Sequence, residues 1–189
     1  MNYFKYILGS TFVGVLVAGL TIASSARATL IDYNLAWSGA EFLNEATATG
    51  TITLDDAIVP VPGNLFGASA ATVGITAFKI SISGASAGNG TFGLSDFDGF
   101  VWAVGPGLDL SVELVGQSGF FDFNIFNAAT SPTAPRGVGE FLIETNGGVA
   151  DLLALTAFTP TSVPEPGALA LVGFGLVGLG VLRRRRQQR

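Results

Sequence analysis

The chain has 189 residues, a formal net charge of −5 at pH 7, and neither cysteine nor histidine. Without these two residue types it lacks disulfides and the usual ligands of zinc, copper and haem. Residues 29–162 hold two basic and 13 acidic side chains, a net charge of −11. Such a region repels phosphate backbones and anionic membrane surfaces, so we expect no nucleic-acid partner. The length favours a single domain.

The first 28 residues have the features of an export signal. Lys5 supplies a positive start, an apolar run covers residues 7–22, and Ala26-Arg27-Ala28 has the small-residue spacing of a cleavage site. Glycines inside the run make it a poor permanent anchor. We therefore predict a signal helix within residues 1–28, with Ala26 and Ala28 defining a cut before Thr29.

The segment 29–158 is predicted to be an all-β domain, an antiparallel β-sandwich or jelly roll. Short apolar or alternating runs are separated by clusters of glycine, proline, asparagine and serine. The strictest alternation lies in residues 108–114, where four apolar side chains share one face. The predicted strands are residues 51–54, 73–83, 100–104, 108–114, 120–126, 140–144 and 152–158.

Two details refine this prediction. In residues 73–83 the apolar side chains change parity near Ala77, which indicates a β-bulge. Phenylalanine is concentrated in the second half of the domain, and we expect these rings to fill the space between two sheets. The rings concerned are Phe92, Phe97, Phe100, Phe120, Phe121, Phe123, Phe126 and Phe141.

Few residues offer chemistry. The run Asp96-Phe97-Asp98-Gly99 resembles part of a calcium loop, but no glutamate follows at the required distance. We therefore expect an acidic turn and no cofactor, with calcium at Asp96 and Asp98 as a weak alternative. The run Gly84-Ala85-Ser86-Ala87-Gly88 matches a nucleophile-elbow spacing, but a chain without histidine lacks the base that activates such a serine. A flexible loop is the expected structure.

Two patterns raise the question of ligand binding. Tyr33, Trp37 and Trp102 are candidates for a platform that stacks sugar rings, although Trp102 lies in an apolar run that favours core packing. A second pattern is a row of threonines on one face of a strand, as in ice-binding surfaces; one row is narrow for that role, so a solvent-facing strand is expected. The row consists of Thr47, Thr49, Thr51 and Thr53.

The C-terminal segment carries the most specific signal. A polar linker at residues 159–162 leads to Val163-Pro164-Glu165-Pro166, then to the uncharged residues 167–182 and to four arginines at 183–186. A helix of that length spans ~24 Å, slightly less than a ~30 Å hydrocarbon core. Arginines remain on the cytoplasmic side. We predict a transmembrane helix at 167–182 that leaves the acidic domain outside the cell membrane.

Residues 163–189 resemble the PEP-CTERM sorting signal, which occurs on many exported proteins of exopolysaccharide-producing Gram-negative bacteria. The resemblance rests on the order of Pro164-Glu165-Pro166, an apolar segment and the cluster Arg183, Arg184, Arg185 and Arg186. It implies that an exosortase, an integral-membrane cysteine protease, recognises the tail and cuts near Val163, Pro164, Glu165 and Pro166. In that reaction the chain is the substrate.

These observations favour a non-enzymatic protein of the cell envelope or extracellular matrix. The expected partners are an exosortase, the inner membrane in a transient way, and exopolysaccharide. The alternatives are a secreted glycoside hydrolase that uses two carboxylates, or a module that binds calcium or ice.

Overall fold

A computed structural model describes residues 30–127, 131–145 and 150–161. Within these ranges the protein is all-β with antiparallel pairing, as predicted. The helical elements there are three short 3-10 turns at Ala40–Phe42, Ala70–Val73 and Leu94–Asp96, and none is long or apolar enough to cross a bilayer. The predicted signal helix and the predicted helix at 167–182 lie outside the described residues.

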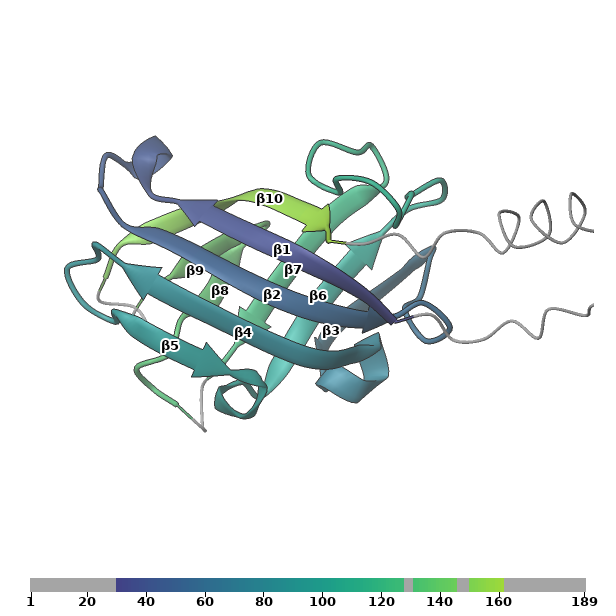
Figure 1. The fold of residues 1–189 in the computed structure, drawn as a ribbon, viewed down its shortest axis with the longest axis horizontal. Coiled ribbons are helices and arrows are strands. Elements are labelled where there is room, and N and C mark those ends of the chain that lie inside the picture. Colours follow the sequence, from purple (N-terminus) through teal and green to yellow (C-terminus); the bar gives the residue numbers. More distant parts are fainter. Residues whose placement is uncertain (1–29, 128–130, 146–149, 162–189) are drawn as a thin grey trace, which may run out of the picture.

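The strands form two curled sheets that face each other across a common core (Figure 1). The larger sheet has the order β5-β4-β2-β1-β10-β9-β8, and the smaller has the order β3-β6-β7. The strands are β1 (Leu30–Ser38), β2 (Thr47–Asp55), β3 (Gly63–Ala68), β4 (Ile75–Ser83), β5 (Gly90–Gly93), β6 (Gly99–Val104), β7 (Phe120–Phe126), β8 (Arg136–Gly139), β9 (Leu142–Glu144) and β10 (Leu152–Pro160).

Six of the seven predicted strands correspond to β2, β4, β6, β7, β9 and β10, with shifted ends. β9 begins only at Leu142 because Phe141 has a left-handed backbone, φ 58°. β10 continues through Pro160, so Thr159 and Pro160 belong to the sheet and not to the predicted linker. The sequence analysis missed β1, β3, β5 and β8, and three of these are short and contain glycine.

The predicted strand at 108–114 is wrong, because this segment forms a loop. The carboxylate of Asp109 accepts hydrogen bonds from the backbone N–H and hydroxyl of Ser111. The side chain of Gln117 bonds the backbone N–H and C=O of Asp109. These local bonds occupy backbone groups that a strand would pair with a neighbour. Leu108 and Leu114 are nevertheless buried, so the apolar pattern anchors a loop to the core.

The predicted bulge near Ala77 is confirmed. Thr53 pairs with Ala77 and Leu54 pairs with Ile75, which leaves Thr76 as the extra residue in β4. The bulge lets both Ile75 and Phe78 point into the core in spite of their opposite parity.

The core contains most of the predicted phenylalanine cluster. Phe97, Phe100, Phe120 and Phe123 are buried, and Phe92 and Phe141 pack against them. At its centre Trp102 of β6 lies 6.3 Å from Phe158 of β10, measured between ring centroids. Two predicted rings are exceptions. The register shift between β6 and β7 falls at Phe121 and leaves it 51% exposed, and Phe126 at the end of β7 is only half-buried and lies outside the core cluster.

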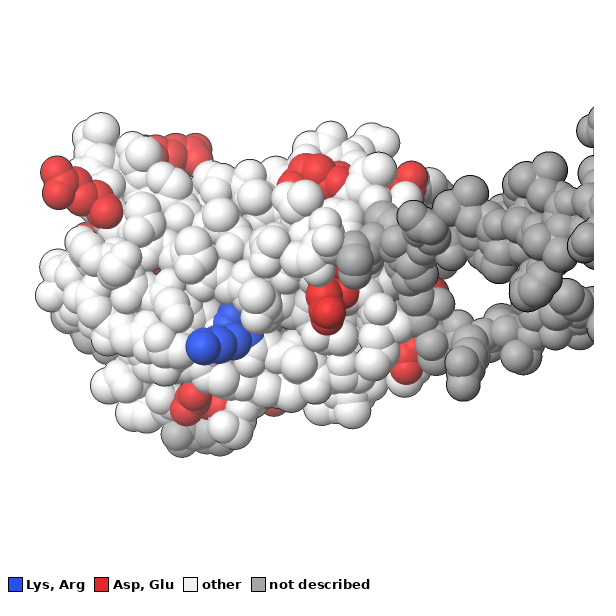
Figure 2. All heavy atoms as spheres, viewed as in Figure 1, with Lys and Arg blue, Asp and Glu red and all other residues white. Residues whose placement is uncertain are grey.

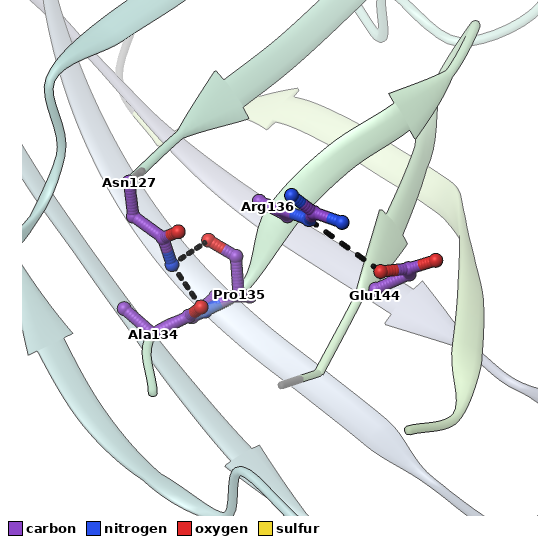
Figure 3. A network of polar contacts seen from close by, with 5 residues as sticks. All are labelled: Asn127, Ala134, Pro135, Arg136 and Glu144. Carbon is purple, nitrogen blue, oxygen red and sulfur yellow. Dashed lines mark hydrogen bonds and ion pairs between the residues drawn. The ribbon is translucent and has the colours of Figure 1, made fainter. Parts of the chain in front are cut away.

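β7 and β8 lie side by side but are joined by side chains and not by a backbone ladder. The amide of Asn124 donates to the backbone C=O of Gly139. The amide of Asn127 donates to the C=O groups of Ala134 and Pro135, as Figure 3 shows. Close by, the guanidinium of Arg136 pairs with Glu144 at 3.5 Å (Figure 3). Buried amides therefore connect the two sheets at this seam.

The first and last described strands are neighbours. Tyr33 in β1 pairs with Pro160 in β10, and the backbone N–H of Thr161 donates to the C=O of Asp32 at 2.7 Å. In Figure 1 the start of β1 and the end of β10 lie at the same pole of the domain. The turns at residues 39–46 and 84–89 lie at the opposite pole.

Candidate functional site

The sequence-predicted sorting and cleavage residues lie outside the described residues. These are Ala26, Ala28, Val163, Pro164, Glu165, Pro166 and Arg183 to Arg186. The structure fixes where the described chain meets the tail: the hydroxyl and the backbone N–H of Thr161 both donate to the C=O of Asp32.

The acidic run around Asp96 has a structural role. The carboxylate of Asp96 accepts a hydrogen bond of 2.7 Å from the backbone N–H of Gly93 and thereby caps the turn Leu94–Asp96. The backbone N–H of Asp98 bonds to the C=O of Phe126. Among the described residues, no three histidine, cysteine, aspartate or glutamate side chains come together as metal ligands would.

The glycine-serine run at 84–88 is a turn between β4 and β5, as expected. Both the backbone N–H and the hydroxyl of Ser86 donate to the carboxylate of Asp151, at 2.6 and 2.8 Å. These bonds lower the pKa of Asp151 below its usual value. Ser86 therefore fastens the turn to the start of β10, without the strand-to-helix geometry of a nucleophile elbow.

The hypothesis of an aromatic platform that stacks sugar rings is wrong. Tyr33, Trp37 and Trp102 are 0%, 3% and 2% exposed, so none of the rings offers a face to a ligand. The hydroxyl of Tyr33 donates to the C=O of Leu110 at 2.7 Å, and the indole N–H of Trp102 donates to Pro60 at 3.2 Å. Each ring thus keeps its polar atom bonded while it fills the core.

The threonine row faces outward, as predicted. In β2 the side chains of Ile52 and Leu54 enter the core while Thr47, Thr49 and Thr51 are exposed. The neighbouring strands do not repeat the row, because Asn34 of β1 and Lys79 of β4 stand on either side of Thr51. A regular array of threonines, as an ice-binding surface needs, is therefore absent from this described face.

A shallow groove of about 500 Å³ lies on this outer face. Its floor is low because Ala36 and Ala157, which pair across two adjacent strands, present only methyl groups to this face. Figure 2 shows this face: the middle is largely uncharged and carries one basic side chain, while acidic side chains lie toward the ends of the strands. The groove is lined by Asn34, Leu35, Ala36, Thr49, Gly50, Thr51, Lys79, Ser81, Ala157 and Thr159.

Strand register orders the polar groups of this groove into a row. Thr159 pairs with Asn34, Asn34 with Thr51, and Thr51 with Lys79, so four strands each contribute one side chain. At ~4.8 Å between strands the row is ~14 Å long. A parallel row of small side chains runs beside it, from Ala157 through Ala36 and Thr49 to Ser81.

The centre of the groove differs from its surroundings in hydrogen bonding. Around it, polar side chains bond one another: Thr47 with Ser83, Thr53 with Asp32, and Ser81 with Thr91. Among the described residues, the side chains of Asn34, Thr49, Thr51 and Lys79 have no such partner. These four side chains therefore present unused donors and acceptors at one place on the sheet.

The two ends of the polar row carry opposite charges. At the β4 end is the ammonium group of Lys79. At the β10 end the hydroxyl of Thr159 donates to the carboxylate of Glu113, which also accepts from the backbone N–H of Phe158 at 2.7 Å. Partial burial opposes ionisation of Glu113, but these hydrogen bonds and that from Val115 prevail and lower its pKa.

Among the described residues, the groove lining contains no aspartate or glutamate. A second cavity, of about 310 Å³, lies under the loop before β7 and is lined by Val115, Gly116, Gln117, Phe120, Phe141 and Leu155, again without a carboxylate. Neither cavity thus has the two facing carboxylates that a glycoside hydrolase of the expected kind requires.

Comparison with protein families gives one match, to the PEP-CTERM protein-sorting motif at residues 162–186. The matched range contains Val163 to Pro166 and all four arginines at 183–186, so the sequence resemblance is confirmed for this segment. A search of curated proteins gives no match, and neither does a search of solved structures. The sorting motif implies an exported, membrane-anchored precursor that an exosortase processes.

Proposed function

We propose that this chain is the precursor of a non-enzymatic cell-surface or matrix protein, which an exosortase processes and which then associates with exopolysaccharide. The observation that carries this proposal is the PEP-CTERM motif at residues 162–186. The motif directs the export and processing of the protein, and the β domain is the part that reaches the cell surface.

The placement of the chain ends supports this proposal. β1 begins and β10 ends at the same pole, so the described chain starts and stops on one side of the domain (Figure 1). A domain attached in this way can stand on the outer surface of the inner membrane with its opposite pole directed away. The net charge of −11 in residues 29–162 keeps the domain from adhering to anionic lipid headgroups.

The non-enzymatic part of the proposal is supported by the composition and by the cavities. The chain has no histidine and no cysteine, and the described residues that line the two cavities include no carboxylate. The outer face of the larger sheet instead offers hydroxyl and amide groups, which suit the binding of a hydroxyl-rich polymer.

Replacement of the sorting motif in the native host tests the processing step. We expect the triple variant Pro164→Ala, Glu165→Ala and Pro166→Ala to accumulate as uncut precursor in the membrane fraction. The matched control is Gln187→Ala with Gln188→Ala, outside the matched range, which should be processed normally. Release of the triple variant at the normal rate would contradict the proposal, and immunoblots of membrane and medium fractions distinguish the outcomes.

A further inference from the structure

We infer that the groove on the outer face of the larger sheet binds a polysaccharide whose carboxylates are spaced by neutral sugars, with Lys79 as the contact to a carboxylate. This inference rests on the proposed association with exopolysaccharide and names the site and the class of glycan. The groove spans β10, β1, β2 and β4 and is exposed along its whole length.

Hydrogen-bonding capacity selects this place on the domain. The side chains of Asn34, Thr49 and Thr51 lie together without partners among the described residues, whereas neighbouring threonines and serines bond each other. A sugar presents hydroxyls that both donate and accept. Amide and hydroxyl side chains in one row can bond successive hydroxyls along a glycan strand.

The shape of the groove suits an extended chain. The row of Thr159, Asn34, Thr51 and Lys79 is straight because each residue pairs directly with the next across the sheet. The parallel row holds Ala157 and Ala36, whose methyl groups leave room for the carbon-bearing face of a sugar ring. A glycan chain that lies across the β-strands would therefore contact polar side chains along one edge and methyl groups along the other.

Charge defines the glycan class. In residues 29–162 the basic residues are Lys79 and Arg136, and Arg136 is paired with Glu144. Lys79 makes no ion pair with any described residue, so its ammonium group is open to a ligand carboxylate. The net charge of −11 repels a densely charged polyanion, and Glu113 marks the opposite end of the row as negative. A polymer with isolated carboxylates satisfies both conditions.

The test uses the mature protein purified from the native host and isothermal titration with three probes. Hyaluronan octasaccharide alternates glucuronate with a neutral sugar, polygalacturonate is densely anionic, and dextran is neutral. We expect the wild-type protein to bind the hyaluronan fragment more tightly than either other probe. Lys79→Gln should weaken that binding by about fivefold, the upper end of the effect of losing one exposed charge contact.

Two variants serve as controls. Arg136→Gln removes the same charge outside the groove and should leave the affinity within about twofold, whereas Lys79→Arg should retain most of the binding. Thr51→Val, which keeps the shape but removes a hydroxyl at the centre of the row, should weaken binding without any change of charge. Near-UV circular dichroism from the buried Trp37 and Trp102 verifies that each variant is folded.

The outcomes separate the inference from the proposed function. If the wild-type protein binds none of the three probes, the proposed polysaccharide association fails and the inference fails with it. If it binds a probe but Lys79→Gln binds equally well, the association stands and the groove assignment is overturned. Thermal hysteresis in place of glycan binding would also overturn it, in favour of an ice-binding face.

Discussion

The two faces of the larger sheet are made by the same strands but differ in burial and in hydrogen bonding. On the inner face of β1, Tyr33, Leu35 and Trp37 are at most 3% exposed and pack into one core. On the outer face, Asn34 and its neighbours Thr51 and Lys79 have no side-chain partner among the described residues. We therefore expect the inward-facing side chains to contribute most of the stability of the fold. The outward-facing side chains remain available for contacts with a ligand.

The largest difference between the faces is expected for adjacent residues of β1. Leu35→Ala should lower the free energy of unfolding by about 2–5 kcal/mol, because it leaves a cavity in the core. Asn34→Ala, one residue earlier, should change it by less than about 0.5 kcal/mol. Urea denaturation followed by tryptophan fluorescence measures both values. Equal losses would show that the outer face contributes to the fold.

A second change tests the seam between β7 and β8, where Asn124 of β7 packs against the glycines of β8. A Cβ at Gly137 would lie 2.6 Å from the side chain of Asn124, so Gly137→Ala should destabilise the protein by about 1–3 kcal/mol. At Gly139 the nearest atom is the end of Leu142 at 3.4 Å, so Gly139→Ala is the matched control. Similar melting temperatures for the two variants would contradict close packing at this seam.

A third change concerns the polar atom on the inner face. Tyr33→Phe removes the hydrogen bond to Leu110 and should cost about 1–2 kcal/mol at pH 7. Burial raises the pKa of Tyr33, with smaller contributions from Asp109 and Asp56. Because the neutral form is favoured in the fold, this contribution is complete below the ordinary tyrosine pKa of ~10 and is lost at higher pH.

The ionisation of Tyr33 at alkaline pH can be measured directly. Tyr33 is the one tyrosine in residues 29–162, so absorbance at alkaline pH reports its ionisation in the mature protein. We expect ionisation of Tyr33 to coincide with unfolding and not to precede it. Ionisation in a folded protein near pH 10 would contradict the buried environment.

The smallest effect is expected at Glu113, which bonds Thr159 at the margin of the groove. Glu113→Gln weakens charge-assisted hydrogen bonds and should cost about 1 kcal/mol at pH 7. The lowered pKa of Glu113 means that its contribution is present at neutral pH and is lost as the pH falls through the acidic range. The variant should therefore have a flatter stability profile below pH ~5 than Glu41→Gln, a change at an exposed carboxylate.

Local patterns in the sequence predicted much of the fold and missed specific parts for physical reasons. Alternation located β2, a short apolar run located β10, and the parity change in β4 located the bulge at Thr76. The same alternation misled at residues 108–114, because side-chain bonds of Asp109 and Gln117 compete with strand pairing. β5 and β8 have glycine-rich sequences, and only pairing with neighbouring strands makes them extended.

The candidate site shows the same division. The threonine row of β2 was visible in the sequence, and two of its members, Thr49 and Thr51, line the groove. Asn34, Lys79 and Thr159 were not predicted as site residues. The outward position of Lys79 follows from alternation in the predicted strand β4, and that of Asn34 follows once β1 is recognised. Their alignment with Thr51 depends on the register of four strands, and register is set by long-range pairing.

The sequence by itself was enough to identify the sorting signal of this protein. The PEP-CTERM motif at residues 162–186 is contiguous, so the order of residue types is enough to identify it. Composition also determined the acidic character of the domain and the absence of histidine and cysteine. Only the tertiary structure decided that Tyr33, Trp37 and Trp102 are core residues and that four distant strands bring Thr159, Asn34, Thr51 and Lys79 into one row. Burial and alignment arise from contacts between residues far apart in the chain, which no local pattern contains.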